Sequence, residues 1–197
     1  MNQPCFDQRS KEISQDVLTS DMCHNISIRG YSDYITLDNS YISISNIFHF
    51  EASAKKMLND NSDSNSHIMI VFGIDNFKEI NKCYGFAVGN ELLSCVQIIL
   101  KSYIDEPHLF CQLYSDSFAI FLENYSDIDL ALLTIQLTEE ITSYNLDIKP
   151  KLSFGICKAD SSDFNIFSLC GRALFARRTI KTDAGQLMAD YHEIAHV

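Results

Sequence analysis

Apolar and polar positions alternate in blocks along the chain, and each block indicates one kind of element. Residues 67–74 form a continuous apolar run, which is typical of a strand buried on both faces. Two shorter apolar runs, 109–113 and 118–122, flank four residues of turn composition and predict a β-hairpin. Residues 151–158 predict a further strand, and residues 186–191 predict a last one.

Apolar residues at helical spacing lie between these strands. They predict helices near 46–59 and 87–104, one from Ser126 to about Asn145, and one over 164–179. Ser126 with Asp129 resembles a capping pair for the third helix. Residues 1–40 show no clear period, and 59–66 are polar enough to form a solvated loop. The order of elements indicates an α/β or α+β sandwich with helices over a sheet.

Composition narrows the class of protein. The 46% hydrophobic fraction fits a soluble globular chain, and the net charge of −11 argues against nucleic-acid polymers and anionic membranes, whose phosphates require clustered Lys and Arg. A mononucleotide needs only local donors and stays compatible. The seven cysteines form no CxxC pair, so we expect buried free thiols in a reducing cytoplasm. No apolar run approaches the ~20 residues of a membrane span, and we expect a cytoplasmic chain.

Residues 71–81, with the sequence VFGIDNFKEIN, carry the most specific pattern in the chain. With Gly85 and Gly89 they resemble the opening signature of the GGDEF family, the diguanylate cyclases: Asp-x-Asp-x-Phe-Lys-x-Ile-Asn-Asp, then Gly-His and Gly-Asp. Three further segments are similar to family segments in the same order: NIFHF at 46–50, KLSFGI at 151–156, and CGRALFARR at 170–178. The last is similar to the family's Ala-Asp-x-Ala-Leu-Tyr-x-Ala-Lys.

The resemblance covers residues 39–191. It implies a five-stranded, mainly antiparallel central sheet flanked by helices, related to the adenylyl cyclase catalytic domain. We therefore expect an unassigned N-terminal extension over 1–38, a GGDEF domain over 39–191, and the start of a linker or following segment over 192–197.

The signature hairpin is where this chain departs most from the family. The family's Gly-Gly-Asp/Glu-Glu-Phe corresponds to Tyr114, Ser115, Asp116, Ser117 and Phe118. Glycines allow a tight turn and close approach of the backbone to a triphosphate, whereas a phenol ring crowds that space. Phe118 is explained by a place in the core of the next strand.

The resemblance also implies which residues would hold the catalytic metal. Gly73 stands at the first Asp of the signature, where the family holds the metal, and Ser117 replaces the hairpin Glu. Asp116 is the sole remaining metal candidate at the matched positions. One carboxylate cannot organise a two-metal centre, and a rescue by Asp75 would need a shifted backbone. We expect no catalytic residues and no required cofactor, with Mg²⁺ or Mn²⁺ relevant only to residual GTP binding.

Base and phosphate contacts are better preserved. By resemblance, Asn81 matches an Asn that reads guanine, and Asn90 replaces the Asp that accepts hydrogen bonds from guanine. Lys78 matches a Lys that contacts phosphate, and Arg178 replaces a Lys near the phosphates. The same residues also fit ordinary turn, cap and solvated positions. The family's product-inhibition site, Arg-x-x-Asp, corresponds to residues 105–108, where Asp105 and His108 stand instead, so that site is expected to be absent.

The resemblance leaves three functions open. The leading one is a catalytically degenerate GGDEF domain that acts as a regulatory, interaction or weak GTP-sensing module in bacterial cyclic-di-GMP signalling. It would be part of a larger protein, with an EAL-type phosphodiesterase domain as the commonest companion, or a homodimer. The second is a low-activity diguanylate cyclase that uses Asp116, Asp75 and a displaced metal. The third is a scaffold or dimerisation domain that binds no nucleotide.

Overall fold

The computed structural model describes residues 44–60, 67–144, 148–160, 163, 165–180 and 185–195. All of them lie in one compact unit, Ile42–Val197. The predicted extension over 1–38 lies outside the described residues, and so do residues 61–66 of the loop predicted over 59–66. Asn59 and Asp60, the first two residues of that predicted loop, instead belong to a helix, Ile44–Asp60. No described helix combines the length and the apolar character needed to cross a membrane.

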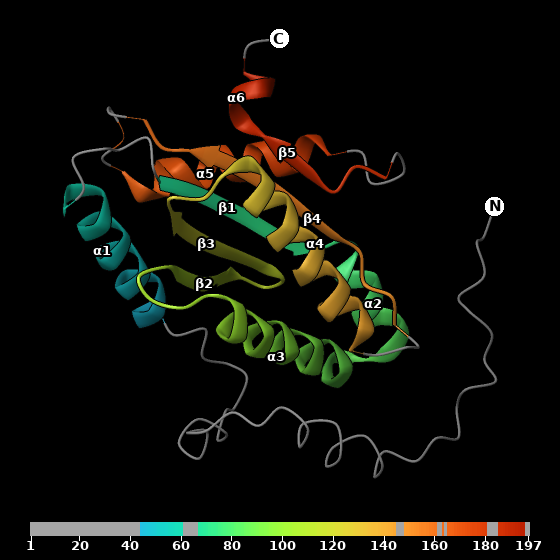
Figure 1. Cartoon of the computed structure of the whole chain (residues 1–197). Helices are drawn as coiled ribbons and strands as arrows, with labels where there is room; N and C mark the ends of the chain where they lie inside the picture. Colours follow the sequence, from blue (N-terminus) through green and yellow to red (C-terminus); the bar gives the residue numbers. More distant parts are fainter. Residues whose placement is uncertain are drawn as a thin grey trace. The chain divides into compact units, whose positions relative to one another are not determined.

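Five strands form one sheet in the order β2-β3-β1-β4-β5 (Figure 1). Their bounds are β1 His67–Ile74, β2 Leu109–Tyr114, β3 Ser117–Glu123, β4 Leu152–Lys158 and β5 Met188–Asp190. The first three neighbouring pairs are antiparallel and β4 pairs with β5 in parallel. The expected five-stranded, mainly antiparallel α+β sheet is confirmed.

Helices cover both faces of this sheet (Figure 1). Their bounds are α1 Ile44–Asp60, α2 Phe77–Tyr84, α3 Phe86–Tyr103, α4 Asp127–Ser143, α5 Ile166–Thr179 and α6 Tyr191–Ile194. Every residue of β1 is buried, because its even-numbered side chains pack in one core with α3 and α4 while Met69 and Val71 pack in the other with α1 and α5. The apolar run at 67–74 therefore predicts the central strand correctly.

Local signals explain several helix boundaries. Ser126 and Asp129 form a complete capping box at the start of α4, as expected. The structure differs at α2, a separate short helix that the sequence pattern did not predict. Its apolar residues Phe77, Ile80 and Tyr84 stand at helical spacing, but eight residues are fewer than the window in which such a period is a clear signal. It ends at Gly85, whose φ of 91° favours glycine and turns the chain into α3.

The end of the chain also differs from the prediction. Only Met188–Asp190 of the expected strand 186–191 pairs with the sheet, and Tyr191 begins α6. The carboxylate of Asp190 accepts from the backbone N–H of His192 and so caps that short helix.

Candidate functional site

The candidate site lies at the end of the sheet where β1, β3 and β4 run side by side. Gly73 on β1 is flanked by Ser117 on β3 and by Ser153 on β4 in the strand register. Cross-strand partners point to the same face of a sheet, so the two serine hydroxyls border the space above Gly73. Both serines are buried.

Arg177 of α5 fills that space. A Cβ atom added to Gly73 would lie 2.6 Å from Cζ of Arg177, closer than real Cβ contacts come. Nε of Arg177 donates to Oγ of Ser153 at 3.0 Å, and Nη1 donates to Oγ of Ser117 at 3.2 Å. The guanidinium therefore depends on a glycine at position 73, since any side chain there would displace it.

The same guanidinium stands between two carboxylates. Nη2 of Arg177 lies 3.8 Å from Oδ1 of Asp75 and 3.9 Å from Oδ2 of Asp116. Only 14% of the Arg177 side chain is exposed, against 13% for Asp75 and 24% for Asp116. Ser153 also donates to Oδ1 of Asp75 at 2.7 Å. These contacts hold one fixed positive charge where two partly buried negative charges meet.

The arrangement of these groups differs from that around a bound divalent metal ion. Mg²⁺ and Mn²⁺ take several oxygen ligands at about 2.0–2.2 Å with open approach to the carboxylates. Here a cationic side chain lies between the two carboxylates instead. Among the described residues, no group of three or more His, Cys, Asp or Glu could hold a metal ion.

A cavity of about 370 Å³ opens at this place. Its lining includes Tyr114 and Asp116 of the hairpin, Arg177 and Arg178 of α5, and Asp75 after β1. The volume falls within the range of about 300–1,000 Å³ that is usual for small-molecule sites. Its charged lining is balanced, because two carboxylates face two guanidinium groups.

The hairpin that lines one side of this cavity has a two-residue turn. Tyr114 pairs with Ser117, which leaves Ser115 and Asp116 at the tip. Ser115 has a φ of 47°, in the left-handed region that a glycine adopts without cost. Tyr114 is 47% exposed and lines the cavity. The hairpin thus keeps the turn that the family's glycines would provide, with a phenol ring and a hydroxyl added to it.

The remaining predicted nucleotide residues lie on α2 and α3. Asn81 packs against Gly89, since a Cβ there would collide with Oδ1 of Asn81. That oxygen is buried and has no hydrogen-bond partner among the described residues. Asn90 follows Gly89 directly and is half-buried, and Lys78 is exposed on α2. The structure therefore brings Asn81 to the start of α3 and brings Arg178 and the hairpin into the cavity.

Arg177 is the site residue that the sequence reasoning missed. The segment 170–178 places an arginine where the family pattern quoted above has its last Ala, directly before the basic residue matched by Arg178. That exchange of a small residue for a cation was the available signal. Its meaning depends on Gly73, which lies 104 positions earlier in the chain and touches Arg177 only after folding.

Comparison with known proteins agrees with this architecture. The sequence model of the family described as "Diguanylate cyclase, GGDEF domain" matches residues 42–185. The chain belongs to the GGDEF family. Over 130 residues, or 62% of the chain, it is also 27% identical to the uncharacterized protein y4lL of Sinorhizobium fredii, and the match spans 16% of that protein's length.

Solved GGDEF domains share the fold at low sequence identity. The active GGEEF domain of a diguanylate cyclase from Vibrio cholerae superposes with a TM-score of 0.62 and 22% identity, covering 75% of this chain and 94% of that one. The GGDEF domain of DgcB from Caulobacter crescentus, solved in complex with c-di-GMP, has a TM-score of 0.61 and 14% identity. The match covers 74% of this chain and 88% of that one. An EAL/GGDEF domain protein from M. capsulatus has a TM-score of 0.60 and 19% identity. The match covers 78% of this chain and 98% of that one.

Proposed function

We propose that this GGDEF domain is catalytically inactive and acts as a regulatory or interaction module in cyclic-di-GMP signalling. The observation that carries the proposal is the guanidinium of Arg177 over Gly73, between Asp75 and Asp116. Gly73 supplies no carboxylate at the position where the family resemblance implies a metal ligand. Arg177 supplies a tethered positive charge in the same place.

Joining two GTP molecules makes demands that this arrangement does not meet. Each 3′-hydroxyl oxygen must attack an α-phosphorus while pyrophosphate leaves, and divalent cations stabilise both the attacking and the leaving oxygens. A guanidinium cannot lower the pKa of a hydroxyl group by direct coordination as a metal does. Arg177 is also held by two hydroxyls and two carboxylates, so it is not free to follow the departing phosphates.

We infer that any GTP binding is weak and depends little on a metal. The proposed contacts are guanine with Asn81 and Asn90, and phosphates with Lys78 and Arg178. Asn90 provides an amide where the family provides a charged acceptor, and a hydrogen bond to a charged group is worth about 1.5–3 kcal/mol. That loss corresponds to roughly 10- to 100-fold in affinity. Tyr114 at the cavity mouth reduces the room for a triphosphate further.

We also propose that the domain extends over about 39–191 and belongs to a longer protein. The small share of y4lL that is matched supports this proposal, as does the existence of EAL/GGDEF proteins such as that from M. capsulatus. An EAL-type phosphodiesterase domain is the proposed companion. A regulatory GGDEF domain needs such an output partner, because it produces no signal itself.

Incubation with GTP tests the proposal. The protein at high concentration is held with GTP and Mn²⁺ for many hours, and the nucleotides are separated by chromatography. We expect no cyclic-di-GMP above a heat-inactivated sample. Product that increases with protein concentration would overturn the proposal and favour the second function, a low-activity cyclase that uses Asp75 and Asp116.

A further inference from the structure

Helix α4 is apolar on two opposite sides. Its inner side packs into the core of the sheet through Leu130, Leu133, Leu137 and Ile141. On its outer side Ile128, Leu132 and Ile135 are 73%, 52% and 46% exposed. Their spacing of four and three residues places them on one face as a continuous ridge. Large apolar side chains exposed next to one another are typical of a surface that binds another molecule, so the outer ridge of α4 has the character of an interface.

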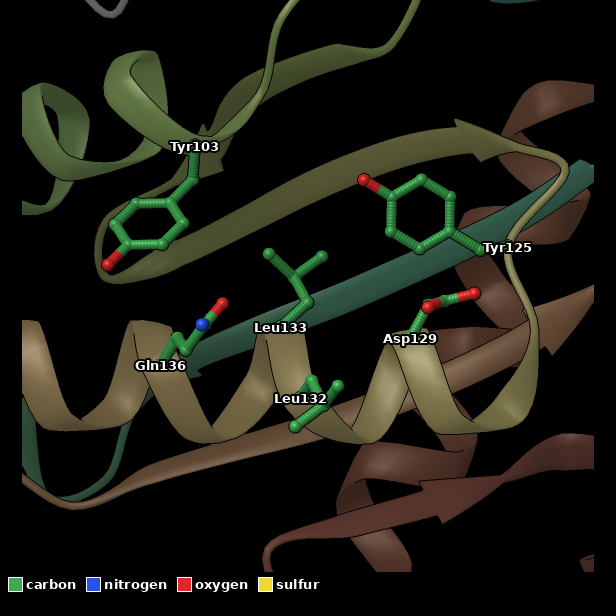
Figure 2. A pocket seen from close by; sticks show the side chains of 6 residues that line it. All are labelled: Tyr103, Tyr125, Asp129, Leu132, Leu133 and Gln136. Atoms are coloured by element: carbon green, nitrogen blue, oxygen red, sulfur yellow. The ribbon is translucent and has the colours of Figure 1, made fainter.

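A recess lies next to this ridge (Figure 2). Tyr103 at the end of α3 and Tyr125 before α4 stand on either side of Leu133, and Leu132, Asp129 and Gln136 complete the lining. Its volume is about 260 Å³, below the range of about 300–1,000 Å³ that holds most small ligands. A recess of this size fits a single anchoring side chain of the kind that dominates binding at protein interfaces.

The charges on α4 indicate what kind of partner fits. The helix carries Asp127, Asp129, Glu139 and Glu140 and no Lys or Arg. The two aspartates lie at the N-terminus, where negative charge is favourable, and are engaged by Lys158 and Ser126. Glu139 and Glu140 are exposed near the C-terminus, where negative charge is unfavourable, and α4 has no basic residue in its last turn. Glu140 accepts one long hydrogen bond of 3.4 Å from the hydroxyl of Tyr103.

We propose that the outer face of α4 binds an amphipathic helix of a partner protein. The apolar seam of that helix would cover Ile128, Leu132 and Ile135, with one large side chain in the recess, and its Lys or Arg residues would face Glu139 and Glu140. Helices commonly dock on proteins in this way. A second copy of this chain fits less well, because two α4 helices would bring acidic ends together in a protein of net charge −11.

This interface does not depend on the proposed loss of catalysis. The ridge lies on α4, which covers the sheet face shared with α3, whereas Arg177 reaches the site from α5 on the opposite face. A result on one surface therefore leaves the other proposal standing.

The probe is a fluorescein-labelled Leu/Lys peptide of about 18 residues, long enough for five helical turns. Binding to the full chain is followed by fluorescence anisotropy at about 0.15 M salt. We expect the double variant L132S/I135S to bind at least tenfold more weakly than the wild type. We expect E139Q/E140Q to bind about threefold more weakly, with a smaller dependence on salt.

Matched controls distinguish specific binding at this surface from nonspecific binding of the peptide. Phe48→Ser removes an apolar side chain of 60% exposure from α1 and should leave the affinity unchanged. A peptide with every Leu replaced by Ala keeps the charge and should not bind. Equal binding to wild type and L132S/I135S, with equal thermal midpoints, would overturn the proposal. A dimer in sedimentation that L132S/I135S abolishes would also overturn it and would make a second copy the occupant.

Discussion

Replacing Arg177 with alanine removes the only described cation between Asp75 and Asp116 and restores the residue type of the family pattern. If the guanidinium substitutes for a metal ion, two effects should appear together. The fold should lose stability, and the site should begin to bind divalent cations. Neither effect is expected if Arg177 is an ordinary surface residue.

The size of the first effect follows from the contacts. Arg177 makes two hydrogen bonds to serine hydroxyls and two ion pairs of 3.8 and 3.9 Å. Breaking a fully buried pair costs about 3–5 kcal/mol, and the partial exposure of Asp116 lowers that figure. We expect a loss of about 2–3 kcal/mol in the free energy of unfolding, or about 4–12 °C in melting temperature for a domain of this size.

The second effect is a rescue by metal. Without Arg177 the two carboxylates repel each other, and a divalent cation between them would relieve that repulsion. If Mn²⁺ then binds with a Kd of about 1 mM, about 10 mM Mn²⁺ should restore roughly 1.4 kcal/mol. The wild-type protein should gain nothing from Mn²⁺, because its site already contains a positive charge.

Urea denaturation of both proteins, with and without Mn²⁺, measures both effects. Arg178→Ala is the matched control, since its exposed side chain precedes the end of the same helix; we expect a change within about 0.5 kcal/mol. The reasoning is refuted if R177A is as stable as R178A, or if Mn²⁺ stabilises the wild type as much as R177A.

Two further predictions concern buried groups. Burial raises the pKa of the thiol to about 12 for Cys111 and Cys170 and to about 11 for Cys157. These three cysteines should therefore react with a thiol reagent only on unfolding, whereas the exposed Cys83 should react in the native protein. Peptide mapping by mass spectrometry checks this, and native labelling of the three at the rate of Cys83 would contradict it. Burial also lowers the pKa of His108, whose Nδ1 accepts a backbone N–H. The stability that neutral His108 contributes is full above about pH 6.5 and is lost as the pH falls through the folded pKa. Urea midpoints from pH 7.5 down to 5 should therefore fall more for the wild type than for His108→Asn, and identical slopes would contradict the prediction.

Much of the fold follows from local patterns in the sequence. The run at 67–74 has the composition of a strand buried on both faces, and it becomes the central strand. Ser126 and Asp129 form the capping box that their spacing predicts. Short-range signals define α2 poorly, because its apolar residues have helical spacing but span only eight positions. They also cannot show that the strand stops at Asp190 and that Tyr191 begins a helix.

The site is less accessible to sequence reasoning. The matched positions identify what has been lost at Gly73 and Ser117, because each can be compared with a pattern. The replacement cannot be read in the same way, since an arginine near the end of an amphipathic helix is usually solvated. Only the packing of α5 against β1 and β4 places Arg177 over Gly73. Long-range compensation of this kind requires a structure.

A calorimetric titration of the wild-type protein with GTP, in the presence and absence of Mg²⁺, tests most directly whether Arg177 has replaced the metal. Removal of a metal carboxylate and insertion of a guanidinium should uncouple nucleotide affinity from the divalent cation. We predict that GTP either binds weakly, with the same affinity with and without Mg²⁺, or does not bind detectably under either condition. A Kd in the low micromolar range that requires Mg²⁺ would contradict the account, because it would demonstrate a working metal site beside Gly73.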